Sequence, residues 1–594
     1  MAKKHIDRAA LIATIRELKE LSNEQKSDIL QLISEQKKYG IVWEDSPEEV
    51  EENLRVNVPV LVEDKDRAII SNADDAPNHI LIEGDNLEAL TALSYTHEGK
   101  IDVIYIDPPY NTGNKDFRYN DSFVDSEDGY RHSKWLSFME KRLKIAKKLL
   151  SDKGVIFISI DDNEQANLKL LCDEIFGACN FVSNIIWQST AGSNTGTDIV
   201  TITEYVLVFS KNRAQCIFDG EEVDDSSYKF SDEYENTRGR YSLDKMDRRR
   251  VGGHYSEALN FPIEMPDGSL RYPGGTETRS DEGWNYLWSK TKVEWGLQNG
   301  FIVFKKGKDG WNVYNKRYSK IDNSGNPIDR TTPYRNLITS DICNTAQGTT
   351  EITNIFGIRT FDFPKPSLLI KRFLSSIVRT NQHSIILDFF AGSGTTLHAT
   401  MQLNAEDGGH RQCVLCTNNE NNICEEVTYE RNKRVINGYT TPKGVEVEGL
   451  HDNSLRYYKI KDVPRDSSTT GLKKLMLAST DLLCIKNDLY EEQSVFGNIK
   501  LRKNIARYFD DGKQKMLIIY KVDAIESIVE EIKKMPADTF IKVYVFSTNN
   551  YAMDADFEDV RDKVFLCALP AAIYNAYRKV LPRKNNVITE EEEV

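Results

Sequence analysis

Apolar residues recur along the chain in two spacings, which predict strands and helices in alternation. Continuous β-branched runs at 101–106, 154–160 and 384–388 predict strands that are buried on both faces. The stretches 132–150 and 163–176 instead carry apolar residues at helical spacing. This alternation predicts an α/β fold of Rossmann-like type, with a mostly parallel, doubly wound sheet.

The same patterns divide the chain into regions of different character. Residues 6–37 have helical spacing and predict a small helical hairpin, and the acidic stretch 45–52 predicts a solvated linker. Residues 190–348 interrupt the α/β rhythm with short, aromatic-rich segments. The predicted domains are an N-terminal helical region (1–75), one half of the α/β core (76–190), an insertion (191–350), the second half of the core (351–455) and a small C-terminal α/β domain (456–594).

Composition places the chain among ordinary globular proteins. It has 594 residues, of which 40% are hydrophobic and 28% charged, which is enough for three or four domains. The first residues run into an amphipathic segment, so neither a signal peptide nor a membrane span is expected. The nine scattered cysteines form no disulfide framework, and the sequence predicts a cytoplasmic location.

The net charge of −15 argues against a generally basic, nucleic-acid-binding surface. A local basic patch can nevertheless coexist with an acidic remainder. The insertion contains such a patch, in which basic and aromatic residues are interleaved, and we expect it to contact the DNA backbone. The candidate DNA-binding residues are Arg238, Arg240, Lys245, Arg248, Arg249 and Arg250.

Candidate chemistry lies directly after the strand predicted at 101–106, in Asp107-Pro108-Pro109-Tyr110. The carboxylate of Asp107 and the carbonyl of Pro108, which two prolines hold rigid, could both accept hydrogen bonds from an exocyclic amine of a nucleobase. Tyr110 offers a flat face on which a base turned out of the duplex can stack. All four residues are therefore catalytic candidates.

A second candidate follows the strand at 384–388, in the turn Asp388-Phe389-Phe390-Ala391-Gly392-Ser393-Gly394-Thr395. Its glycines allow a ligand to approach the backbone closely. Leu397 breaks the dinucleotide fingerprint, and no phosphate-binding loop follows. Cys413 and Cys416 lack the further ligands of a zinc site, so no metal is expected.

With these motifs the chain resembles the amino-methylating DNA methyltransferases of the β class, and most closely the Mod subunit of type III restriction-modification systems. The resemblance covers about residues 76–190 and 355–440. It implies methylation of adenine N6 by S-adenosyl-L-methionine, a Mod homodimer acting on double-stranded DNA, and a nuclease-helicase partner, Res. The implied cofactor-binding residues are Asp85, Lys365, Pro366, Asp388, Phe390, Gly392, Ser393, Gly394, Thr395 and Glu420.

Three alternatives stay open at this point. A stand-alone adenine methyltransferase without a nuclease partner would carry the same motifs. An N4-cytosine enzyme is a second alternative. The resemblance nevertheless favours adenine, because Asp at position 107 is typical of the adenine enzymes and Ser is commoner in the cytosine enzymes. A non-catalytic DNA-binding specificity protein is the third, and it would be expected to have eroded motifs, whereas both motifs are intact.

Overall fold

The computed structural model describes residues 41–580, apart from 45, 115, 120–121, 126–127, 193–198, 224, 251–253, 280–282, 309, 329 and 549–550. The predicted N-terminal hairpin and the acidic tail after residue 580 lie outside the described residues. The chain forms two compact units: Gly220–Tyr334 is one, and the residues before and after it make the other. Within the described ranges, no helix combines the length and the apolar character needed to cross a membrane.

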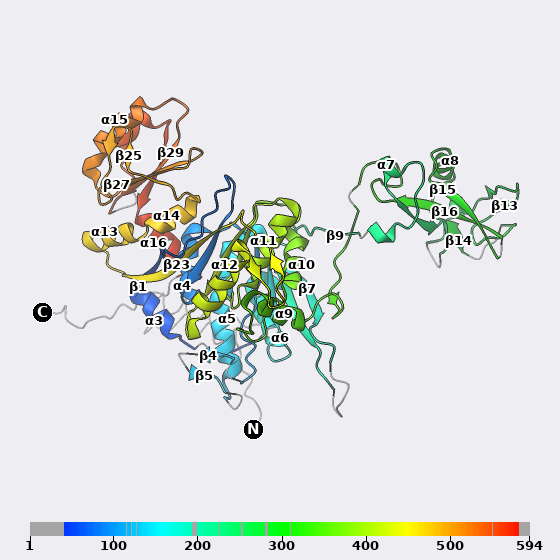
Figure 1. Cartoon of the computed structure of the whole chain (residues 1–594), viewed down its shortest axis with the longest axis horizontal. Coiled ribbons are helices and arrows are strands. Elements are labelled where there is room, and N and C mark those ends of the chain that lie inside the picture. Colours follow the sequence, from blue (N-terminus) through cyan, green and yellow to red (C-terminus); the bar gives the residue numbers. More distant parts are fainter. Residues whose placement is uncertain are drawn as a thin grey trace, which may run out of the picture. The chain divides into compact units, whose positions relative to one another are not determined.

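The larger unit is built around a mixed sheet of ten described strands (Figure 1). Neighbouring strands are parallel from β23 to β6, while β1, β8 and β7 add antiparallel pairs on the two sides. The predicted α/β fold class is confirmed. In spatial order the strands are β1 (Asn57–Glu63), β23 (Ser454–Pro464), β2 (Asn78–Glu83), β20 (Gln412–Thr417), β19 (Ile385–Asp388), β3 (Ile101–Ile106), β6 (Leu150–Ile160), β8 (Thr203–Ser210), β7 (Phe181–Gln188) and β18 (Leu337–Ile338).

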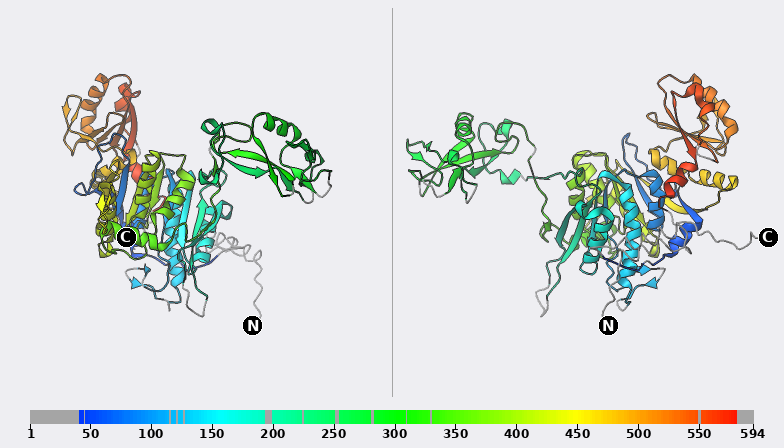
Figure 2. Two further views of the ribbon diagram at one scale, coloured as in Figure 1. Left: turned by 45° about the vertical axis from the view of Figure 1, so that its right-hand side comes forward. Right: turned by 180° about the vertical axis from the view of Figure 1, so that it is seen from behind.

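Helices cover both faces of this sheet, as the two further views also show (Figure 2). Successive side chains of a strand point to opposite faces, so β3 sends Ile104 and Ile106 into one core and Val103 and Tyr105 into the other. The first core packs on α4 (Asn86–Thr96), α5 (Arg131–Leu149) and α6 (Gln165–Cys172). The second packs on α9 (Thr345–Phe356), α10 (Ser367–Val378), α11 (Thr395–Asp407) and α12 (Glu430–Asn437).

The N-terminal region is more than the helical segment expected over residues 1–75. Its described part contains the helix α3 (Glu49–Val56), and β1 then joins the edge of the large sheet. The acidic stretch 45–52 is also not a solvated linker throughout, because Glu48 is buried beside an arginine and closes a capping box at the start of α3.

The smaller unit, Gly220–Tyr334, has its own core around Met246, Phe301 and Tyr318. This unit contains fewer residues than the predicted insertion of 191–350, because β8 and β18, which lie within those bounds, pair within the large sheet. Its elements are β9 (Glu221–Glu222), α7 (Glu235–Arg238), β10 (Tyr241–Lys245), β11 (Asp247–Arg249), β12 (Ile263–Glu264), β13 (Leu270–Arg271), β14 (Trp284–Tyr286), α8 (Lys290–Gln298), β15 (Ile302–Gly307), β16 (Gly310–Tyr318) and β17 (Thr331–Thr332).

The C-terminal region contains a five-stranded sheet of its own, in the order β24-β27-β28-β29-β30. The hydroxyl of Tyr577, on α16, the last helix of the described residues, donates to the carbonyl of Pro59 at 2.9 Å and so ties this region to β1. The elements are α13 (Thr469–Ala478), α14 (Thr480–Asn487), β24 (Glu492–Gln493), β25 (Val495–Phe496), β26 (Ile499–Lys500), β27 (Ala506–Asp510), β28 (Lys515–Ile519), α15 (Ile525–Lys534), β29 (Ile541–Phe546), β30 (Val564–Leu569) and α16 (Ala571–Tyr577).

Candidate active site

The carboxyl ends of four neighbouring strands, β2, β20, β19 and β3, meet around one cavity of about 670 Å³. Parallel strands of an α/β sheet present their loops at the same edge, which is where such folds bind ligands. The cavity is lined by residues that follow each strand, among them Gly84, Asp85, Asn86, Asp107, Pro108, Pro109, Phe389, Phe390, Gly392, Thr417, Asn418 and Glu420. The two stretches singled out in the sequence therefore share one cavity.

The Asp107–Tyr110 turn is held in place by partners that are distant in sequence. The indole nitrogen of Trp135, on α5, donates to the carbonyl of Pro109 at 2.7 Å. Asn111, which follows Tyr110, adopts a positive φ of 57° and donates to the buried carboxylate of Glu164 at 2.6 Å. These bonds fix the C-terminal end of the rigid proline segment.

Tyr110 and Asp107 belong to a cluster of four polar side chains. The Tyr110 hydroxyl lies 2.9 Å from Asp107 Oδ1 and 2.9 Å from Glu204 Oε2. The Lys365 ammonium lies 3.0 Å from Asp107 Oδ2, 3.2 Å from Glu204 Oε2 and 2.9 Å from the Tyr110 hydroxyl. Glu204 comes from β8, a strand that the sequence-based division had assigned to the insertion.

The charges of this cluster compensate one another. Burial disfavours the Lys365 ammonium, but Asp107 and Glu204 outweigh that cost and raise the pKa of Lys365. Burial and the same two carboxylates raise the pKa of the Tyr110 hydroxyl well above its usual value. Lys365 therefore stays charged and Tyr110 stays neutral at ordinary pH.

The buried side chain of Asp388 holds the glycine-rich turn in its conformation. This buried carboxylate accepts hydrogen bonds from the Phe390 backbone amide at 3.0 Å and from the Thr396 hydroxyl at 2.5 Å. Burial raises the pKa of Asp388 to about 7. Asp388 is not among the residues that line the cavity, and its hydrogen bonds shape the turn.

The remaining residues of this turn divide between the cavity and the interior. Phe390 and Gly392 line the cavity. The hydroxyls of Ser393 and Thr395 instead accept hydrogen bonds from the buried guanidinium of Arg431, at 3.2 and 2.7 Å. These two hydroxyls anchor the start of α11 to α12.

The other cofactor candidates are also found in different places. Asp85 and Glu420 line the cavity from the ends of β2 and β20. Lys365 and Pro366 do not line it, since Lys365 contacts the Asp107–Tyr110 turn and Pro366 caps α10. Lys365 is thus part of the site through its ion pair with Asp107, while its predicted contact with the cofactor stays a prediction.

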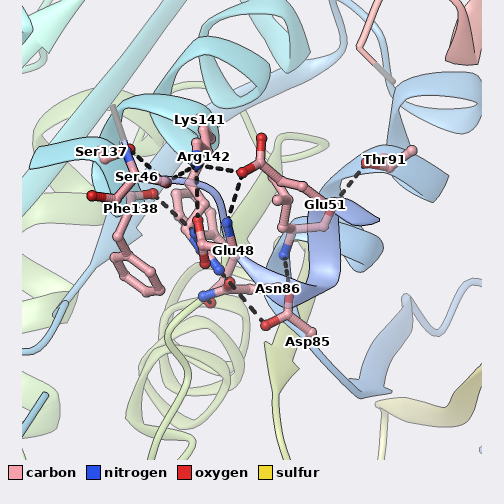
Figure 3. A network of polar contacts seen from close by, with 12 residues as sticks. Ser46, Glu48, Glu51, Asp85, Asn86, Thr91, Ser137, Phe138, Lys141 and Arg142 are labelled. Carbon is pink, nitrogen blue, oxygen red and sulfur yellow. Dashed lines mark hydrogen bonds and ion pairs between the residues drawn. The ribbon is translucent and has the colours of Figure 1, made fainter. Parts of the chain in front are cut away.

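A buried arginine, Arg142 on α5, supports the wall of the cavity next to Asp85 (Figure 3). Its guanidinium donates to Asn86 Oδ1 at 2.5 Å and to Glu48 Oε1 at 2.8 Å, and it lies 3.6 Å from Asp85 Oδ2. It also stacks on the Phe138 ring, 3.6 Å from the ring centre. The arginine therefore joins α3, α4 and α5 at the cavity wall.

The candidate DNA-binding residues all lie in the smaller unit, but they are not equivalent. Arg238 stacks on the rings of Tyr234 and Phe301 and donates to a backbone carbonyl, which is a structural role. Arg240, Lys245, Arg248, Arg249 and Arg250 have exposed side chains. Arg248 and Arg249 lie on β11, so alternation directs them to opposite faces of that strand.

The sequence-based prediction missed three residues around the cavity and the Asp107 cluster: Glu204, Arg142 and Glu48. Glu204 stands in a strand pattern, Arg142 in a helix pattern and Glu48 in an acidic run, so each had an ordinary local explanation. A charged residue at a position that the apolar spacing requires to be buried is the signal that could have revealed Arg142.

The fold is that of an α/β methyltransferase, in which the Asp107–Tyr110 turn precedes the glycine-rich turn in sequence. Residues 101–430 match the family model described as DNA methylase, for N6 and N4 methyltransferases. The chain belongs to this family, which confirms the resemblance noted from the sequence.

Curated relatives of the chain include type III Mod subunits and a type II methyltransferase. It is 33% identical to the type III restriction-modification enzyme StyLTI Mod subunit of Salmonella typhimurium, over 61% of this chain and 55% of that protein. It is 32% identical to the EcoPI Mod subunit of Escherichia phage P1, over 62% of each chain. It is 34% identical to the type II methyltransferase M.KpnI of Klebsiella pneumoniae, over 66% of this chain and 92% of that protein. The matched region thus spans less than two thirds of the length of either Mod subunit.

The two glycines of the turn should differ in what they tolerate. An added Cβ at Gly394 would lie 2.4 Å from Asn432 Nδ2 and 3.2 Å from the Thr428 carbonyl, whereas at Gly392 its nearest neighbour would be 3.4 Å away. Gly394→Ala should therefore lower the melting temperature of the unliganded protein more than Gly392→Ala does. The Gly392→Ala substitution should lower the free energy of unfolding by about 1–2 kcal/mol, because alanine disfavours the left-handed backbone conformation at that position. Equal shifts in thermal unfolding would contradict this difference.

Removing the buried arginine should destabilise the protein strongly. Arg142→Met leaves the buried Glu48 carboxylate with the more distant Lys141 ammonium, 3.8 Å away, and loss of one partner of a buried ion pair costs up to about 3–5 kcal/mol. Lys144→Met on the same helix is the matched control, because it breaks a surface ion pair with Glu140 that is worth at most about 1 kcal/mol. Chemical denaturation of both variants would measure the difference, and comparable losses would show that the buried pair has no special weight.

Proposed function

We propose that this chain transfers a methyl group from S-adenosyl-L-methionine to N6 of an adenine in double-stranded DNA, as the modification and recognition subunit of a type III restriction-modification system. The observation that carries the proposal is the cavity that Asp107 and Pro108 share with Gly392, Asp85 and Glu420. The similarity to two Mod subunits supports the type III assignment.

The residues of the cavity fit the methyl donor. The carboxylate of Glu420, which follows β20 and lines the cavity, can accept hydrogen bonds from ribose hydroxyls. The turn at Gly392, which has a positive φ of 48°, lets the backbone approach a ligand closely. Phe389 and Phe390 supply apolar contact surface, and Asp85 supplies a further acceptor. When bound, S-adenosyl-L-methionine provides an electrophilic methyl group.

The chain itself prepares the amine of the target base. An exocyclic amine is a weak nucleophile because its lone pair is delocalised into the ring. Asp107 and the carbonyl of Pro108 accept hydrogen bonds from the two N–H groups and so favour a tetrahedral nitrogen. Tyr110 stacks on the extruded base. The hydrogen bond from Tyr110 and the ion pair with Lys365 keep the Asp107 carboxylate oriented.

The smaller unit is the proposed DNA-reading module, with Arg240, Lys245, Arg248, Arg249 and Arg250 as phosphate contacts. A homodimer and a Res partner complete the proposal. A stand-alone methyltransferase is the second candidate, because the similarity to M.KpnI covers 92% of that type II enzyme. Copurification of the chain with a nuclease-helicase encoded beside it would favour the type III assignment, and full site-specific methylation by a chain without such a neighbour would favour the second.

Replacing the catalytic carboxylate should abolish methylation without loss of donor binding. Asp107→Ala should lower the methylation rate by at least about 100-fold, because the carboxylate acts on the amine in the transition state, and should leave the Kd for S-adenosyl-L-methionine within about twofold. Mass spectrometry of digested DNA would follow N6-methyladenine, and calorimetry would measure the donor affinity. Asp152→Ala, which removes an exposed carboxylate paired with Lys211, is the control. N4-methylcytosine as the product would overturn the adenine assignment.

The basic residues of the smaller unit should determine how DNA binding depends on salt. Changing Arg248, Arg249 and Arg250 together to Ala should flatten the plot of log binding constant against log salt concentration by up to about three units of slope. Changing Lys305, Lys306 and Lys308 to Ala removes the same charge from exposed positions of the same unit and is the matched control. If both triple variants flatten the plot equally, the effect comes from total charge and the arginines are not specific contacts.

A further inference from the structure

The Tyr110 hydroxyl occupies an unusual position between two carboxylates. Its oxygen lies 2.9 Å from Asp107 Oδ1 and 2.9 Å from Glu204 Oε2. A hydroxyl carries one proton, so at any moment it can donate to only one of these oxygens. Through its lone pairs it can accept a hydrogen bond from the other side. The three groups therefore form a continuous path from Asp107 to Glu204.

Methylation of an amine produces a proton that must leave the site. The amine nitrogen forms a bond to the methyl carbon, the carbon–sulfur bond breaks, and its electron pair remains on sulfur. The nitrogen is then positively charged and still carries both of its original protons. One of them must be released to restore the neutral methylated amine.

We propose that Glu204 takes up this proton through Tyr110, an inference that rests on the methyltransferase function proposed above. The amine gives its proton to Asp107 Oδ1. That oxygen passes a proton to the Tyr110 oxygen as the Tyr110 hydroxyl gives its own proton to Glu204 Oε2. Tyr110 is neutral before and after the step, Asp107 is again a carboxylate, and Glu204 is a carboxylic acid.

Lys365 makes this path electrostatically feasible. Its ammonium lies 3.0 Å from Asp107 Oδ2 and 3.2 Å from Glu204 Oε2, so it offsets the repulsion between the two carboxylates before the reaction. After the transfer, the neutral Glu204 leaves Lys365 paired with Asp107 alone. The Glu204 side chain is 18% exposed, which gives its proton access to solvent for the next cycle.

The competing explanation is that Glu204 only holds Tyr110 and Lys365 in position. Glutamine separates the two roles, because its amide oxygen can accept the same hydrogen bonds but cannot take up the proton under these conditions. Aspartate retains an ionisable group at the same place. A purely structural role would therefore be preserved by Glu204→Gln, and a proton-accepting role would not.

The test is a single-turnover measurement on the full chain, with S-adenosyl-L-methionine and DNA both saturating. Glu204→Gln should lower the methylation rate at least about 10-fold while the donor Kd and the DNA Kd remain those of the wild type. Glu204→Asp should recover part of the rate. Glu406→Gln, which breaks the surface ion pair with Lys371 on another element, should retain the wild-type rate.

A double-mutant cycle shows whether Glu204 acts through Tyr110. In a Tyr110→Phe background, which keeps the ring but removes the hydroxyl, Glu204→Gln should change the rate by less than about twofold. A wild-type rate in Glu204→Gln, a loss of donor affinity in that variant, or independent effects of the two substitutions would each overturn the proposal. If the wild type methylates DNA, any of these results refutes only the proton-transfer role of Glu204 and leaves the proposed methyltransferase function intact. If the wild type does not methylate DNA, both the methyltransferase function and the proton-transfer role are refuted.

Discussion

The parallel pairing of β3 with β19 is the constraint on which the site depends. Val103 lies beside Ile386 and Ile104 beside Leu387, although residues 107–384 separate the two strands in the sequence. Because both strands end at the same edge of the sheet, the pairing brings the turn after Ile106 beside the turn after Leu387. Buried apolar side chains on both faces hold the two strands in this register. No flexible loop is needed to bring the proline turn to the glycine turn.

Two buried cations adapt this scaffold to a cavity with many carboxylates. Lys365 bridges Asp107 and Glu204, and Arg142 bridges Glu48 and Asn86 beside Asp85. Each cation connects residues from elements that are distant in sequence, so each fixes geometry as well as charge. A lone carboxylate in such surroundings would lose much of its hydration, and a partner at hydrogen-bonding distance compensates for that loss. The acidic net charge of the chain is thus compatible with buried anions at the site.

The sequence predicts the parts of this structure that depend on local pattern. The runs at 101–106 and 384–388 are apolar enough to require burial on both faces. The turns that follow them contain two prolines in one case, which restrict the backbone, and two glycines in the other, which free it. The position of Lys365 could not be predicted, because its partners Asp107 and Glu204 are set by the order of strands in the sheet. The role of Arg238 was also hidden, since its stacking on Tyr234 and Phe301 exists only in the folded unit. Local pattern therefore predicts elements, while contacts across the sheet decide roles.

The order of strands in the sheet has a consequence for how the protein is made. Both neighbours of β2, the strands β20 and β23, lie more than 300 residues later in the chain, and β1 also pairs with β23. During synthesis these early apolar strands emerge with no partner, while the whole of Gly220–Tyr334 is still to be translated. Closing such distant contacts is slow, and unpaired apolar edges associate readily with other chains. The nascent chain therefore passes through a long period in which its future sheet is open to aggregation and to capture by chaperones.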